Sequence, residues 1–139
     1  MTMSLSTALR NTRAQDIVDA IDAGATPGTM EIYTAPRPAT GAAITTQTKL
    51  GTLTFSQPCG TVEGGVITLN AITGDEAADA SNTDPGLWSR VKDGDGDFVI
   101  DWDVSAPGGG GDVIINTINI VEGGPISTVG PQTITEGGA

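Results

Sequence analysis

The sequence predicts a mainly β protein, an antiparallel β-sandwich or jelly roll with one N-terminal helix or arm. Short runs of β-branched and aromatic residues recur along the 139-residue chain, and clusters of turn-forming residues separate them. Glycine and threonine each occur 20 times, a composition that favours strands and turns over helices. Only the N-terminal fifth has a helical pattern. A regular succession of short strands favours a sandwich over a parallel sheet.

The length of the chain fits one domain. A chain of this size buries roughly two thirds of its unfolded surface, enough for a core without cross-links. We therefore expect a single domain in which residues 1–25 form the N-terminal arm and helix and residues 26–139 form the β-sandwich.

The helix is expected over about residues 13–23. Its apolar stripe, spaced i, i+3, i+4 and i+7, consists of Ala14, Ile17, Val18 and Ile21. Thr12 and Gln15 have the spacing of a capping box, and Gly24 stands where a C-terminal cap belongs.

Leu5 and Leu9 fall away from this stripe on the helical wheel. Either the helix is apolar on two sides, or the first residues form a separate arm. In both cases the two leucines need an apolar partner, which is either their own sheet or another subunit.

Seven or eight short strands follow the helix. The candidate strands are residues 29–34, 51–55, 66–72, 87–93, 97–104, 112–121 and a last run from 125 or 127 to 135. The loops between them are expected at residues 36–41, 57–65, 74–86, 107–111 and 123–125. The glycine run at 108–111 is either an ordinary mobile loop or a joint that lets the C-terminal strands complete a neighbour's sandwich.

Residues 88–104 predict a β-hairpin with two different faces. Alternate apolar residues are expected in the core, namely Phe98, Ile100, Trp102 and Val104. The residues between them are expected on the other face, with the carboxylates in water, namely Asp97, Val99, Asp101 and Asp103. In this register Trp102 belongs to the core rather than to a sugar-stacking surface.

The charge balance excludes nucleic acid as a partner. The net charge is −11, and 11 of the 17 acidic residues lie between Glu63 and Asp112. Such a surface repels phosphates and is strongly hydrated. No apolar run approaches the roughly 18 residues of a membrane span, and the N-terminus lacks the pattern of a signal peptide. We therefore expect no membrane association and synthesis in a cytosol.

No catalytic, metal or cofactor site is predicted. The Asp-Gly-Asp-Gly-Asp run at residues 93–97 has the alternate spacing of calcium ligands, but Phe98 and Val104 stand where a calcium loop needs glycine and glutamate. A hairpin turn with Gly94 and Gly96 at positive φ is the main interpretation, and a weak calcium site is the alternative.

Two further patterns involve residue types that can carry chemistry. Asp101 and Asp103 share a strand face at a separation of roughly 7 Å, which could in principle serve a glycosidase. The sequence predicts no aromatic-lined cleft around them, so catalysis is not expected. Cys59 is the one cysteine, and the chain has no histidine that could act as its base, so we expect a small core or loop residue.

Several segments together resemble a family of small proteins of tailed bacteriophages and prophages, the capsid cement or head decoration proteins. The segments are SLSTALRNTRAQDIVDAIDAG, EIYTAPRPAT, LGTLTFSQP, LWSRVKDGDGDFVIDWDVS and GGDVIINTINIVEGGPIS. They cover nearly the whole chain, although none is a chemical signature.

The resemblance implies a structural virion protein without enzymatic activity. Such a protein is made in the bacterial cytoplasm, binds the outer surface of the capsid, and bridges major capsid subunits to stabilise the mature shell. It also implies self-association, as a homodimer or possible trimer, through a jelly roll or related sandwich. The candidate interface residues are Leu5, Leu9, Ile17, Val18, Ile21, Ile118, Ile120 and Ile126. The same residues could instead form the internal core.

A tail-fibre or receptor-binding β-module that recognises host glycans is the alternative function. It predicts exposed tryptophans, namely Trp88 or Trp102, and a glycosidase predicts a cleft around Asp101 and Asp103. Cementing predicts neither feature.

Overall fold

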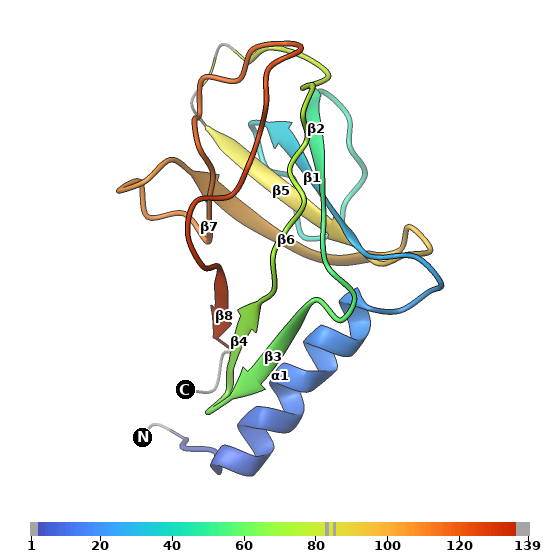
Figure 1. Cartoon of the computed structure of the whole chain (residues 1–139), viewed down its shortest axis with the longest axis vertical. Coiled ribbons are helices and arrows are strands. Elements are labelled where there is room, and N and C mark those ends of the chain that lie inside the picture. The colour runs from blue at the N-terminus through green and yellow to red at the C-terminus, as the bar shows by residue number, and fades with distance from the viewer. Residues whose placement is uncertain (1–2, 83, 85, 136–139) are drawn as a thin grey trace.

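The computed structural model describes residues 3–82, 84 and 86–135. The described residues form one helix and eight strands. In chain order these are α1 (Thr7–Ile21), β1 (Thr29–Thr34), β2 (Lys49–Thr54), β3 (Gly60–Glu63), β4 (Val66–Leu69), β5 (Leu87–Lys92), β6 (Phe98–Ser105), β7 (Val113–Ile114) and β8 (Thr133–Thr135). The predicted mainly β fold with a single N-terminal helix is confirmed (Figure 1).

The strands form two sheets. The large sheet is curled and has the order β2-β1-β5-β6-β7, and the small sheet has the order β3-β4-β8 (Figure 1). Strand pairs are antiparallel except for the short pairing of β6 with β7, which is parallel. The helix α1 packs on β3 and β4 of the small sheet, and β8 pairs with β4 at the other edge of that sheet (Figure 1).

One hydrophobic core connects the helix to both sheets. Its members include Ala14, Val18 and Ile21 of α1, Met30, Ile32 and Leu53 of the large sheet, and Ile67 and Leu69 of the small sheet. Cys59 is buried in the same cluster, as predicted for a small core residue. Burial, together with the neighbouring Asp22 carboxylate, raises the pKa of the Cys59 thiol to about 12, which keeps it protonated and unreactive at neutral pH.

The helix begins six residues before the predicted start. Ser6 is the N-cap, and its hydroxyl accepts a hydrogen bond from the Leu9 N–H at 3.2 Å. The expected capping box at Thr12 is wrong, because the Thr12 hydroxyl donates to the Ala8 carbonyl inside the helix. The helix ends at Ile21, two residues before the predicted end, and Asp22 rather than Gly24 is its C-cap. Gly24 follows two residues later with a φ of 95°.

Replacing Ser6 by alanine is expected to lower the free energy of unfolding by about 1 kcal/mol, since one N-terminal N–H loses its acceptor. Thr12→Ala is the matched control, and its effect should stay within about 0.5 kcal/mol because the side chain is exposed. Denaturant titration of both variants measures the difference. A larger loss for Thr12→Ala would show that the helix begins where its sequence pattern placed it.

Most predicted strands are present, with shifted ends. Residues 29–34 form β1 as expected, and β2, β5 and β6 lie within two residues of their predicted bounds. The prediction is wrong for β3, which occupies the expected loop at 57–65, and the predicted strands at 112–121 and 125–135 shrink to β7 and β8.

Candidate functional site

Four of the eight candidate interface residues belong to the internal core. Val18, Ile21, Ile120 and Ile126 are at most 3% exposed. Their assignment to a partner interface is therefore corrected, because a side chain enclosed by its own chain has no surface left for another protein. Ile17 is half-buried and packs against the same core.

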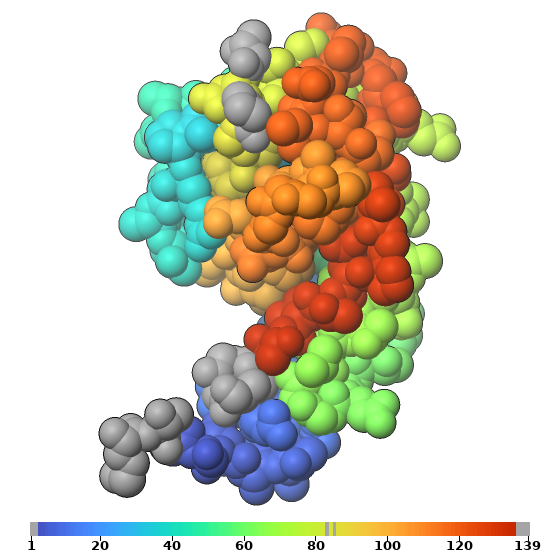
Figure 2. Space-filling model, turned by 90° about the vertical axis from the view of Figure 1, so that its left-hand side faces the viewer, coloured from blue at the N-terminus to red at the C-terminus, as the bar shows by residue number. Residues whose placement is uncertain are grey.

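The first residues of the chain carry apolar side chains that the chain does not cover. Met3 is 75% exposed, Leu9 is 46% exposed and Leu5 is half-buried. They lie around the start of α1, at the lower end of the molecule in Figures 1 and 2. We call Met3, Leu5 and Leu9 the N-terminal tip. Two of its members were predicted, and Met3 was missed because it stands outside any periodic pattern.

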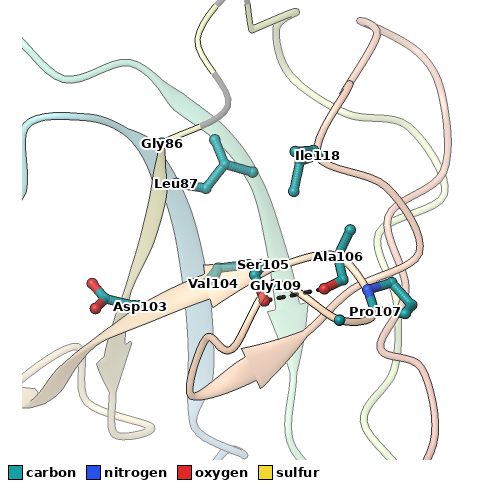
Figure 3. Close-up of a pocket in the computed structure, with 10 residues that line it drawn as sticks. Gly86, Leu87, Asp103, Val104, Ser105, Ala106, Pro107, Gly109 and Ile118 are labelled. Atoms are coloured by element: carbon teal, nitrogen blue, oxygen red, sulfur yellow. Dashed lines mark hydrogen bonds between the residues drawn. The ribbon is translucent and has the colours of Figure 1, made fainter.

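Ile118, the remaining candidate, lines an open cleft of about 630 Å³ beside the end of β6. Leu87 and Ile118 point into the same space, with Ala106 and Pro107 below them and Asp103 at the opposite edge (Figure 3). We call this space the β6 cleft. Its complete lining is Gly86, Leu87, Asp103, Val104, Ser105, Ala106, Pro107, Gly108, Gly109 and Ile118.

Ser105 holds the glycine-rich wall of the β6 cleft in place. Its hydroxyl donates to the Ala106 carbonyl at 3.2 Å and accepts a hydrogen bond from the Gly111 N–H at 2.9 Å. The Gly109 N–H donates to the Ala106 carbonyl at 2.9 Å, and Gly108 adopts a positive φ of 84°. The glycine run is thus a closed, internally bonded turn in this structure, which gives the cleft a defined wall.

Asp101 does not face water as predicted. It forms a bidentate pair with Arg90, with Arg90 Nε to Asp101 Oδ1 at 2.8 Å and Arg90 Nη2 to Asp101 Oδ2 at 3.0 Å, and its side chain is fully buried. The loop between β1 and β2 covers the pair, since the Gly41 N–H donates to Asp101 Oδ2 at 2.9 Å. Arg37 of the same loop pairs with Asp103 at 3.1 Å.

This pairing decides the protonation state of Asp101. Burial by itself raises the pKa of the carboxyl, but hydrogen bonds from Arg90 and from the Gly41 N–H, with the charges of Arg90 and Arg37, outweigh burial and lower it. A retaining or inverting glycosidase needs one protonated carboxylic acid. Asp101 therefore cannot serve as that acid at neutral pH.

Phe98, on the same sheet face, is a second residue whose sequence assignment is corrected. Phe98 was expected in the core, but it is 42% exposed and its ring lies against the Arg90 guanidinium, 5.2 Å from ring centroid to Cζ. Arg90 also lies over the Trp88 ring, 5.4 Å from its centroid, and Trp88 stacks on Tyr33. The irregular register between β5 and β6 beside Lys92 displaces Phe98 from the alternation predicted for β6.

The acidic run at residues 93–97 forms a turn. Asp93 Oδ1 accepts hydrogen bonds from the N–H groups of Asp95 and Asp97, at 3.0 Å and 2.9 Å. Gly96 has positive φ, as expected, but Gly94 does not; a side chain at Gly94 would lie 1.9 Å from the Thr26 carbonyl oxygen. Within the described ranges, no group of three or more acidic, histidine or cysteine side chains is placed to hold a metal ion.

Both tryptophans are buried. The indole N–H of Trp88 donates to the Thr34 carbonyl at 2.9 Å, and Trp102 belongs to the core as predicted. The exposed tryptophans required by the glycan-binding alternative are therefore not found at these two positions.

Among the described residues, the apolar N-terminal tip and the apolar β6 cleft are two surfaces available for contact, beside the single exposed side chains of Phe98, Val121 and Val129. In the part of the chain that the structure describes, no helix is both long enough and apolar enough to cross a bilayer. Comparisons of the chain with protein-family models, with curated proteins and with solved structures found no match.

Proposed function

We propose that this chain is a capsid cement protein of a tailed bacteriophage. It is made in the bacterial cytoplasm, binds the outside of the head as a homo-oligomer, and bridges neighbouring major capsid subunits without catalysing a reaction. The resemblance of five segments of the sequence to head decoration proteins supports this function. The net charge of −11 suits a surface that faces solvent outside a shell packed with DNA.

The observation that carries the proposal is the uncovered N-terminal tip. Met3 and Leu9 are among the few large apolar side chains exposed in the described residues, and they lie close together in sequence at the start of α1. Exposed apolar groups that gather at one place mark contact surfaces. The candidate acid Asp101, by contrast, is held as an ion under a loop. Adhesion therefore fits this chain better than catalysis.

Cementing works by adding buried area across subunit junctions. A specific protein interface typically buries about 800 Å² per partner. An oligomer that binds two capsid subunits at once binds more tightly, because the second contact forms at a high effective concentration. Because the contact is repeated over the whole head, each contact can be weak and the shell is still stabilised. The expected outcome is a shell that withstands more heat or internal pressure when the protein is attached.

Heating shells assembled without the protein tests this function. Adding the purified native chain is expected to raise the temperature at which the shells break and release DNA, measured by dye accessibility. Leu9→Glu should reduce the rise, because it removes an apolar contact of the tip while completing a capping box with Ser6, so the helix stays folded.

Val121→Asp is the matched control for that experiment. Val121 is 65% exposed and belongs to neither the tip nor the β6 cleft, so this variant should protect shells as the native chain does. Shells that break at the same temperature with and without the native chain would contradict the proposed function.

A further inference from the structure

We propose that the N-terminal tip of one copy docks in the β6 cleft of a second copy. This inference develops the self-association part of the proposed function and does not depend on the capsid part, since the contact forms between copies in solution. It rests on three observations: the apolar character of both surfaces, their opposite charges, and their separation within one chain.

The two surfaces match in polarity. The tip offers the side chains of Met3, Leu5 and Leu9, and the β6 cleft offers Leu87 and Ile118 on facing walls (Figure 3). A space of about 630 Å³ lies within the range of about 300–1,000 Å³ typical of pockets that enclose a ligand. It can therefore take two or three aliphatic side chains. Burying them removes apolar surface of both copies from water.

The two surfaces also differ in charge. Residues 3–12 contain Arg10 and no acidic residue, in a chain whose net charge is −11. The border of the β6 cleft carries two carboxylates beside the Arg37–Asp103 pair: Asp84 accepts from the N–H of the lining residue Gly86, and Asp112 accepts from the N–H of Asp103. The cation beside the apolar tip complements these carboxylates, which favours this encounter over tip against tip.

The tip cannot fill the cleft of its own chain. Figures 1 and 2 both place the start of α1 at the lower end of the molecule and the loop between β6 and β7 on the body above it. The helix is fixed there by Ala14, Val18 and Ile21, which are buried in the core. A second copy is therefore the occupant to which the geometry points.

The contact joins two different surfaces, so repeated contacts give a finite oligomer only if the assembly closes on itself. Two copies that exchange tips form a two-fold dimer with two such contacts, and a head-to-tail ring of three is the other small closed form. Either form predicts that Leu5 of one copy lies close to the cleft residue Ala106 of another.

Pairwise disulfide trapping tests this contact in the absence of capsids. We expect Leu5→Cys mixed with Ala106→Cys to form a disulfide-linked species under mild oxidation, seen on a non-reducing gel. Neither variant alone should cross-link with itself. Native Cys59 does not interfere, because it is buried and its thiol stays protonated. Thr61→Cys, on the exposed outer side of the small sheet, mixed with Ala106→Cys is the negative control.

Sedimentation velocity supplies the second readout. The native chain and Val121→Asp should form a dimer or trimer, and Leu9→Glu should be monomeric. A monomeric native chain, or self-cross-linking of Leu5→Cys without the mixed product, overturns the tip-in-cleft contact. If the native chain is monomeric and Leu9→Glu still fails to protect shells, the tip binds the capsid instead. Failure of the capsid experiment alone leaves the mixed cross-link intact.

Discussion

Replacing Arg90 by methionine is expected to lower the free energy of unfolding by about 3 kcal/mol, because it leaves the Asp101 carboxylate buried without its cation. This value is at the lower end of the range for buried pairs, since an irregular loop and the 42% exposed Phe98 side chain cover the pair. Urea titration at pH 7 measures the loss.

The double variant Arg90→Met/Asp101→Leu is the control for this result. Two apolar side chains of similar volume can replace a buried pair at little cost, so the double variant should be much more stable than Arg90→Met. A single variant as stable as the native chain would show that Asp101 is hydrated, as its place in the alternating sequence had predicted.

The same pair produces a dependence on pH. The pKa of Asp101 is lower in the folded chain than its ordinary value of about 3.9 in the unfolded chain. The carboxylate therefore contributes its full stability above pH 4 to 5, and this stability is lost as the pH falls through the folded pKa. As the pH falls below about 5, the native chain should lose stability more steeply than the double variant.

Replacing Ile21 by alanine is expected to lower the free energy of unfolding by about 2–5 kcal/mol, because Ile21 is the last residue of α1 and is fully buried in the core. Val121→Ala is the control and should change the stability by less than about 0.5 kcal/mol, since Val121 is 65% exposed and belongs to neither the tip nor the β6 cleft. Thermal unfolding of both variants compares them. Equal losses would mean that Ile21 does not contribute to the core.

The sequence predicted the helix and the central strands because their residues carry strong local patterns. The apolar stripe of Ala14, Val18 and Ile21 is the face that is buried, although the helix starts earlier, at Thr7. The strand β3 was missed because its residues alternate weakly. Gly64 and Gly65 at positive φ form the two-residue turn between β3 and β4, and this Gly-Gly signal could have identified the hairpin.

The C-terminal strands were overestimated for a different reason. Residues 115–132 have strand composition, but side-chain amides take the place of a regular ladder. Asn82 accepts from the Ile120 N–H, Asn116 from the Ser127 N–H, and Gln132 from the Ile114 N–H. Local patterns cannot show such bonds, because the partners are up to 38 residues apart.

The candidate site could be predicted only in part. Leu5 and Leu9 stand out from the helical stripe in the sequence, and the structure leaves Leu9 exposed and Leu5 half-buried. The β6 cleft brings together Leu87, Ala106 and Ile118 from three separate segments, so no spacing pattern could identify it. The burial of Asp101 was likewise hidden, because it depends on a loop 60 residues away.

Binding of the purified chain to purified heads that lack it tests whether the chain is a capsid cement protein. We expect the chain to sediment with the heads, to saturate at a fixed ratio to the major capsid protein, and to appear as added density on the outer surface in electron micrographs. A chain that stays in the supernatant at every concentration, or that binds tail fibres and not heads, would contradict it.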